Sequence, residues 1–241
     1  MEIRIESLLE GATRATGAVA IIDVFRAFTT AAVVLAEGAE RIVMVGTVEE
    51  ALALRASGTG HLCIGEVGGK APPGFDFGNS PVEILEASRA SAAFRGKTVI
   101  QRTGAGTQGI VAAQASAERL YAASLVIATA TARALRSGGA RTITLVAMGN
   151  RTIVRTDEDE ICAIHLRNLL EGRPGDPYAV RRLILAGGEI ADYHDPERPH
   201  LRSGDIDIAL DIDRFDFAIA VAIEDGKAVA RKAEAKLLSR S

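Results

Sequence analysis

The chain has no tryptophan, and its aromatic residues together make up only 4% of 241 residues. It therefore offers few rings on which bases or sugars could stack. An excess of one charge is also missing, because 28 lysines and arginines stand against 31 aspartates and glutamates. Proteins that bind many phosphates of a nucleic-acid backbone carry a surplus of basic side chains. Nucleic acids are therefore disfavoured as partners.

Cysteines and long apolar runs are scarce as well. Cys63 and Cys162 have no partners at metal-ligand spacing, so neither a zinc site nor a disulfide framework is indicated. The apolar runs are far shorter than the roughly 20 residues that a membrane-spanning helix needs. The N-terminus is acidic where a signal peptide is basic. We expect a cytoplasmic protein without a membrane partner.

Hydrophobic residues make up 48% of the chain, enough for a substantial core. Residues 17–24, GAVAIIDV, form a nearly continuous apolar run typical of a strand covered on both faces. Helical spacing follows over residues 26–40, and the alternation of strand and helix continues along the chain. Further strands are expected at 41–45, 61–65, 96–100, 118–124, 141–147 and 217–223. This pattern predicts an α/β fold, with a mixed or mostly parallel sheet flanked by helices in three layers.

The length suits a single domain over residues 1–241. The turn GRPGDP at 172–177 is where two subdomains would divide. A helix is expected on each side of it, at 156–172 and up to about residue 185. The charged tail from residue 227 onward is expected to be solvated.

Ligands of open α/β sheets bind where strands end and helices begin, and polar clusters stand at four such places. The first is Asp23 with Arg26. A carboxylate at a strand end suits Mg2+, and an arginine offers a two-pronged contact to a phosphate or sulfonate. A structural ion pair or a helix cap is the alternative. Phe25 stands where haloacid-dehalogenase phosphatases need a second aspartate, which disfavours that family.

The second cluster lies in GEVGGKAPPGFDFGNSP, residues 65–81, a long irregular segment after a predicted strand. Its glycines let the backbone approach an anion closely. Glu66 and Asp76 offer oxygen ligands to a hard cation, and Lys70 offers a positive charge. A mobile surface turn, with Asn79 belonging to a helix cap, is the alternative. Long irregular connections are uncommon unless they are used, so we favour a functional role.

The third cluster is the glycine-rich turn QRTGAGTQG, which precedes a predicted helix. Its backbone N–H groups and the helix N-terminus are suited to holding a phosphate. It is not a Walker P-loop, since no GKS or GKT closes it, and a lone G-x-G-x-x-G is weak evidence for a dinucleotide site. A plain strand-to-helix turn is the alternative.

The fourth cluster is the acidic start of the helix at 156–172, with Thr156 as its expected cap. Glu158, Asp159 and Glu160 are suited to a metal, although acids in the first turn of a helix are favoured by its dipole in any case. Other polar side chains are not assigned to a site. Four histidines lack triad or metal spacing: His61, His165, His194 and His200. Four aspartates are expected on a solvated helix face: Asp205, Asp207, Asp211 and Asp213.

In this order and at these intervals, IIDVFRAFTTAAVVLAEGA, GEVGG…GFDFGNSP, TVIQRTGAGTQG and TDEDEICA resemble the ComB family of 2-phosphosulfolactate phosphatases. DIDIALDIDRFDFAIAV is similar to the family's C-terminal segment, so the resemblance covers nearly the whole chain. It implies an α/β fold of its own and a magnesium-dependent phosphatase. The implied reaction converts 2-phosphosulfolactate to sulfolactate and phosphate, a step toward coenzyme M. Glu158 and Asp159 match the family's acidic motif.

One motif departs from the family. Residues 102–107 read RTGAGT where members often carry a run like TTTNGT, so Ala105 replaces an asparagine. The identity of the substrate is therefore open. Another small acidic phosphoester is one alternative, and a non-catalytic anion-binding protein of the same fold is another. The sequence also leaves assembly into a homodimer open.

The residues assigned to the site fall into three groups. Charge neutralisation of a phosphoryl transfer requires cations around its transition state. The catalytic candidates are Asp23, Arg26 and Asp76. The acids expected to hold Mg2+ are Asp23, Glu66, Asp76, Glu158 and Asp159. The groups expected to bind the substrate are Lys70, Asn79, Arg102, Thr103, Gly104, Gly106 and Thr107. Attack on phosphorus would come from water or from an aspartate, with Asp23 preferred.

Overall fold

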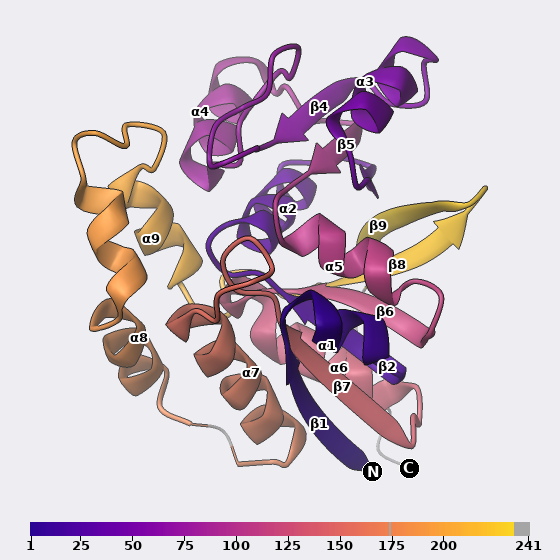
Figure 1. Ribbon diagram of the computed structural model, residues 1–241, viewed down its shortest axis with the longest axis vertical. Coiled ribbons are helices and arrows are strands. Elements are labelled where there is room, and N and C mark those ends of the chain that lie inside the picture. The colour runs from indigo at the N-terminus through magenta and orange to yellow at the C-terminus, as the bar shows by residue number, and fades with distance from the viewer. Residues whose placement is uncertain (174, 234–241) are drawn as a thin grey trace.

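The computed structural model describes residues 1–173 and 175–233. It contains a nine-stranded mixed sheet with helices on both faces (Figure 1). The strands are β1 (Glu2–Ser7), β2 (Gly17–Ile22), β3 (Arg41–Met44), β4 (Leu62–Gly65), β5 (Thr98–Arg102), β6 (Ala117–Ala123), β7 (Thr142–Ala147), β8 (Ala218–Glu224) and β9 (Lys227–Ala233). The α-helices are α1 (Leu8–Arg14), α2 (Ala27–Ala36), α3 (Val48–Ala56), α4 (Pro81–Ser91), α5 (Gly106–Ala113), α6 (Ala128–Ser137), α7 (Asp157–Leu170), α8 (Pro177–Leu185) and α9 (Ser203–Ala209). Two short 3-10 helices are η1 (Leu125–Ile127) and η2 (Gly188–His194).

The sheet consists of two parallel blocks that run in opposite directions. The strand order is β1-β7-β2-β6-β8-β9-β3-β5-β4. The strands β1, β7, β2 and β6 are parallel to one another, as are β3, β5 and β4. Between the blocks, β8 and β9 make antiparallel ladders with each other and with their outer neighbours. The predicted mixed or mostly parallel sheet is confirmed.

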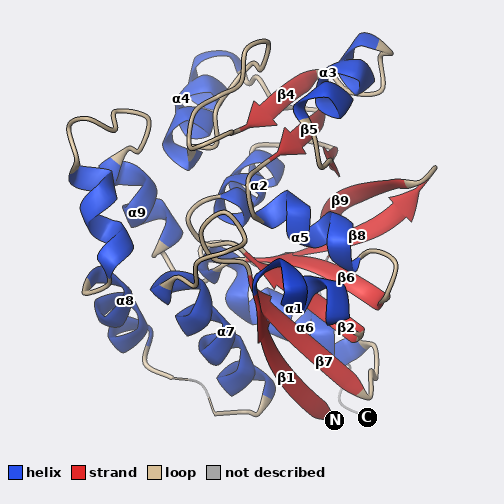
Figure 2. Cartoon of the chain, viewed as in Figure 1, coloured by secondary structure: helices blue, strands red, loops and turns tan. Residues whose placement is uncertain are grey.

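The helices cover the sheet in layers, as predicted. On β2, Val19 and Ile21 face the layer that holds α1, α2, α4 and α5. The alternate residues Ala18, Ala20 and Ile22 face α6, α7, α8 and α9. The helix α3 packs separately on β3, β4 and β5. In the view of Figure 2, α2 and α5 are drawn between the strands β4 and β5 and the strands β1, β7 and β2.

The C-terminal part of the sheet corrects the sequence analysis. The predicted solvated tail is a strand over Lys227–Ala233, and the rest of that tail lies outside the described residues. Ala228, Val229 and Ala230 are buried, because β9 pairs with β8 on one side and β3 on the other. Asp225 and Gly226 both have positive φ and make the tight turn that leads into β9, as expected of a hairpin built on Asp-Gly.

The organisation as one domain stays a prediction. The segment 172–177 links α7 to α8 in the sequence, and these two helices contact each other. None of the helices in residues 1–173 and 175–233 combines the length and the hydropathy required to cross a bilayer.

Candidate functional site

Asp23 follows β2 directly and lies between the N-termini of α2 and α5. Its side chain is 5% exposed, and the N–H of Ala27 donates to its Oδ1 over 2.9 Å. A Cβ at Gly106 would lie 2.9 Å from Oδ2 of Asp23 and 2.8 Å from the Cβ of Ala27. Only glycine therefore allows α5 to begin so close to this carboxylate. Two helix N-termini favour negative charge at this position.

Asp159, near the start of α7, joins the ends of β2 and β7. Its Oδ1 accepts from the N–H of Val24 over 2.7 Å, and its Oδ2 accepts from the N–H of Gly149 over 2.9 Å. Asp159 and Glu158 are 2% and 4% exposed, so these two acids are buried and do not form a solvated first turn of the helix. Glu160, by contrast, pairs with Arg155 nearer the surface.

Buried acids repel one another at this site. Burial raises the pKa of Asp23 to about 6, and the charge of Glu66 adds to the effect. Burial likewise raises the pKa of Glu158 to about 7. The pKa of Asp159 lies well above its usual range, because of burial first and the charges of Glu158 and Asp23 next. Protons or a cation would relieve this repulsion.

Glu66 follows β4 and connects two glycine-rich segments. Its Oε2 accepts from the N–H of Gly69 over 2.7 Å, and its Oε1 accepts from the N–H of Gly104. A Cβ at Gly104 would lie 2.9 Å from Oε1, so glycine is needed for this approach. The carboxylate of Glu66 thus occupies an N–H donor that was predicted for a substrate anion.

The guanidinium of Arg26 is buried against the segment that follows α8. It forms an ion pair with Asp205 over 2.8 Å and donates to the carbonyl of His200 over 3.1 Å. The ring of Tyr193 lies 5.8 Å from its central carbon. The prediction that Asp205 lies on a solvated face is wrong, because Asp205 is fully buried. None of these three partners of Arg26 was expected from the sequence.

Asp76 lies in a different environment from Asp23. Its Oδ2 accepts from the guanidinium of Arg55 over 2.9 Å and from the N–H of Cys63 over 2.7 Å. Its side chain is one-third exposed. These contacts hold the 65–81 loop against α3 and β4.

Other predicted binding residues stabilise the turn after β5. Arg102 donates to the carbonyl of Glu66 over 2.7 Å and to that of Gly46 over 3.3 Å. The buried threonines Thr103 and Thr107 bond to each other, with the N–H of each donating to the hydroxyl of the other over 2.9 and 3.1 Å. These contacts shape the turn that places Gly104 and Gly106 beside the acids.

Asn79 and Lys70 have groups that are free to meet a ligand. Asn79 is 5% exposed, and its Oδ1 has no partner among the residues described. Such an orphaned oxygen is costly unless something donates to it. Lys70 is exposed near His200, whose pKa is lowered by burial and then by the charges of Lys70 and Arg26.

The acids fit a divalent cation in charge and donor chemistry. Carboxylate oxygens are the ligands that Mg2+ prefers. Asp23, Glu158 and Asp159 are all buried with raised pKa values, and the charge of Asp23 contributes to the rise at the other two. Within the described part of the chain, however, no three or more acidic, histidine or cysteine side chains are arranged to hold a metal ion. The predicted five-acid ligand set therefore does not occur as a preformed cage, and the metal stays a prediction.

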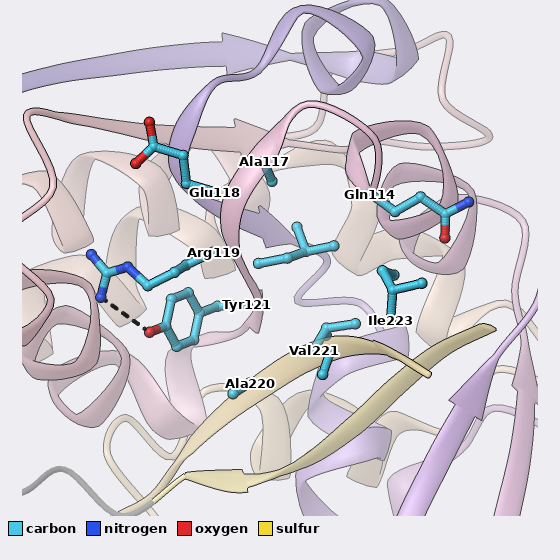
Figure 3. Close-up of a pocket in the computed structure, with 10 residues that line it drawn as sticks. Gln114, Ala117, Glu118, Arg119, Tyr121, Ala220, Val221 and Ile223 are labelled. Carbon is cyan, nitrogen blue, oxygen red and sulfur yellow. Dashed lines mark hydrogen bonds between the residues drawn. The ribbon is translucent and has the colours of Figure 1, made fainter. Parts of the chain in front are cut away.

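A cavity of about 300 Å³ lies elsewhere, between β6 and β8, as Figure 3 shows. None of the predicted site residues lines it. Arg119 at its edge donates to the carbonyls of Ala134 and Leu135 at the end of α6, over 3.3 and 3.2 Å. Its guanidinium is thus used as a helix cap, which gives the cavity no assigned chemistry.

Comparisons with known proteins point to one family. The model of the 2-phosphosulpholactate phosphatase family matches residues 4–188. A probable 2-phosphosulfolactate phosphatase of Thermoplasma volcanium is 32% identical over 81% of this chain and 85% of that protein. Probable 2-phosphosulfolactate phosphatases of Deinococcus radiodurans and Carboxydothermus hydrogenoformans are 38% and 44% identical, over 57% and 48% of this chain. The chain spans about half the length of these last two relatives, 55% and 45%.

Proposed function

The chain belongs to the 2-phosphosulfolactate phosphatase family, and from this premise we propose that it hydrolyses 2-phosphosulfolactate to sulfolactate and phosphate. The observation that carries the proposal is Asp23, a buried carboxylate between two helix N-termini and beside the acids of α7. Helix N-termini bind phosphate, and a carboxylate beside one can attack or orient a nucleophile. The product would serve a route toward coenzyme M.

Asp23 is the proposed nucleophile. With a pKa of about 6 it is mostly ionised at pH 7. One of its oxygens forms a bond to phosphorus, the bond between phosphorus and the ester oxygen breaks, and the sulfolactate oxygen leaves and takes up a proton from solvent. Water then attacks the phosphorus of the acyl phosphate, which releases inorganic phosphate and a proton and restores the Asp23 carboxylate. Trapping a phosphorylated Asp23 with radiolabelled substrate tests this route against direct attack by water.

Mg2+ is the proposed cofactor, and the buried acids Asp23, Glu158 and Asp159 are the residues that would hold it, although the described residues form no preformed cage. When bound, it would neutralise phosphoryl charge in the transition state. The N–H groups of Gly104 and Gly106 bond to the carboxylates of Glu66 and Asp23, so they would meet phosphoryl oxygens only if the substrate displaced these carboxylates. We assign Asp76 to holding the 65–81 loop, on the strength of its contacts with Arg55 and Cys63.

A substrate panel tests the proposed function. Phosphate release is measured with Mg2+ for 2-phosphosulfolactate and for small phosphoesters that carry a carboxylate, a sulfonate or neither. We expect the highest kcat/KM for 2-phosphosulfolactate. Comparable turnover of every ester would point to another acidic substrate. Tight binding without phosphate release would instead identify an anion-binding protein.

The pH dependence of stability is a separate prediction, made for the metal-free protein. In the unfolded chain Asp23 and Glu158 titrate near pH 4, but folding raises their pKa values to about 6 and about 7. The folded protein holds more protons between these values, so stability falls as the pH rises from about 4 to about 7. Each pKa unit corresponds to about 1.4 kcal/mol. We expect a loss of a few kcal/mol, seen as a lower Tm.

Thermal melts at pH 5 and pH 8, with and without Mg2+, measure this effect. Mg2+ should raise Tm more at pH 8, where the acids are ionised, than at pH 5. Glu158→Gln removes one of the charges and should flatten the pH dependence of the metal-free protein. An equal shift by Mg2+ at both pH values would contradict the predicted cation site.

A further inference from the structure

The two carboxylate oxygens of Asp205 accept hydrogen bonds from different partners. Oδ1 accepts from the hydroxyl of Ser80 over 2.6 Å and from the N–H of Val82 over 3.2 Å, which ties α9 to the start of α4. Oδ2 accepts from Arg26 over 2.8 Å. With no exposed surface, Asp205 is held rigidly from both sides. Its position therefore fixes that of the arginine.

Arg26 is anchored through one nitrogen only. Asp205 and the carbonyl of His200 both accept from Nη1. The described residues supply no acceptor for Nε or Nη2, so these donors are left for another oxygen. Arg26 directly precedes Ala27, whose N–H donates to Asp23 over 2.9 Å, and the positive charge of Arg26 acts against the rise of the Asp23 pKa that burial causes. An arginine held in this way is suited to a phosphoryl oxygen bound beside Asp23.

A buried ion pair contributes little net stability, because desolvation of both charges offsets their attraction. A role in orienting Arg26 explains why such a pair is present. Its acceptors and the Tyr193 ring come from residues 193–205, beyond residues 4–188 that the family model matches.

We propose that Asp205 is a positioning residue that holds the guanidinium of Arg26 so that Nε and Nη2 meet the phosphoryl group. This inference rests on the proposed function. It assigns to α9 a part in the reaction, although Asp205 itself touches no reacting atom.

Asp205→Asn tests the inference, because the amide keeps the shape of the carboxylate but loses its charge. Outer partners that orient functional groups typically contribute 10- to 100-fold, and we expect a fall of about that size in kcat/KM. The same substitution is then made in an Arg26→Lys background. If Asp205 acts through Arg26, its loss there should cost much less than in the wild-type background.

Ile206→Val is the matched control. Ile206 is the buried neighbour of Asp205 in α9 and belongs to the core that packs on α6 and α7. This variant should lose stability and keep wild-type kcat/KM. It therefore distinguishes the effect of weakened packing from the effect of a misplaced Arg26 guanidinium. Wild-type kinetics in Asp205→Asn, or an equal loss in both Arg26 backgrounds, would overturn the positioning role.

Calorimetric binding of inorganic phosphate separates this inference from the proposed function. Asp205→Asn should weaken phosphate binding even if the wild-type protein releases no phosphate from any ester. Absence of turnover in the wild type would reject the proposed function alone. Unchanged phosphate affinity in Asp205→Asn would reject the positioning role alone.

Discussion

Replacing Asp23 with asparagine should lower kcat for phosphate release by at least about 1,000-fold, as expected when a nucleophile is removed. Asparagine fills the same space between α2 and α5, and its amide oxygen can still accept from the N–H of Ala27. It carries no charge and cannot form the phosphoenzyme. Steady-state assays of phosphate release, with circular dichroism to show that the variant is folded, measure the effect.

Asp211→Asn is the control for this experiment. Asp211 is exposed and pairs only with Arg214 in the described structure, three residues further along the chain. Its amide variant should keep wild-type kcat. If Asp23→Asn kept more than about a tenth of wild-type kcat, direct attack by water would replace Asp23 as the proposed route.

The second large effect is expected on stability. Arg26→Met removes the partner of Asp205, which is fully buried, and leaves an uncompensated charge in the interior. Breaking a buried pair in this way costs about 3–5 kcal/mol. Urea unfolding measures the loss. The double variant Arg26→Met with Asp205→Asn should regain much of the stability, because the uncompensated charge is gone and the amide oxygen can still accept from Ser80 and Val82. It should remain inactive, because it lacks the guanidinium.

Arg214→Met provides the comparison for an exposed pair. Its partner Asp211 is 52% exposed, so the loss should be below about 1 kcal/mol. If Arg26→Met lowered the free energy of unfolding no more than this control, water would have to reach Asp205, which contradicts its burial.

The alternation of strands and helices from residue 17 to residue 223 could largely be read from the sequence, because apolar runs and helical spacing are local, whereas β1 and α1 were not expected. Residues 17–24 are an example, since β2 is covered on both faces as their pattern predicts. The opposite direction of the two blocks could not be read, since it depends on pairing between distant strands. The β8–β9 hairpin did have a local signal in Asp225 and Gly226, which the alanine-rich, charged sequence around β9 obscured.

The roles of the site residues stay predictions, and the structure shows only which of these residues lie together. Asp23, Glu66 and Asp159 follow strands or begin a helix, and the structure gathers them with Gly104 and Gly106. Asp76 is also a carboxylate and lies in the same loop as Glu66, but its side chain pairs with Arg55 instead of joining the other acids. The spacing of residues in the sequence does not predict this pairing.

The burial of Asp205 did have a sequence signal. It lies four residues before Ala209 on α9, so the two share a helix face, and Ala209 is apolar and fully buried. The aspartate-rich composition of the segment hid this relation. Its pairing with Arg26 joins residues 179 positions apart, which only the tertiary structure reveals.

The position of β8 and β9 between the two blocks has a consequence for biosynthesis. These are the last strands of the described chain, yet they separate β6 from β3 in the middle of the sheet. A nascent chain emerging from the ribosome can pair β1, β2, β6 and β7 early. The strands β8 and β9, which join the two blocks, can pair with β6 and β3 only after residue 233 has left the ribosome. Closure across such sequence distances is slow, and until then the unpaired edges of β6 and β3 are exposed to association with other chains.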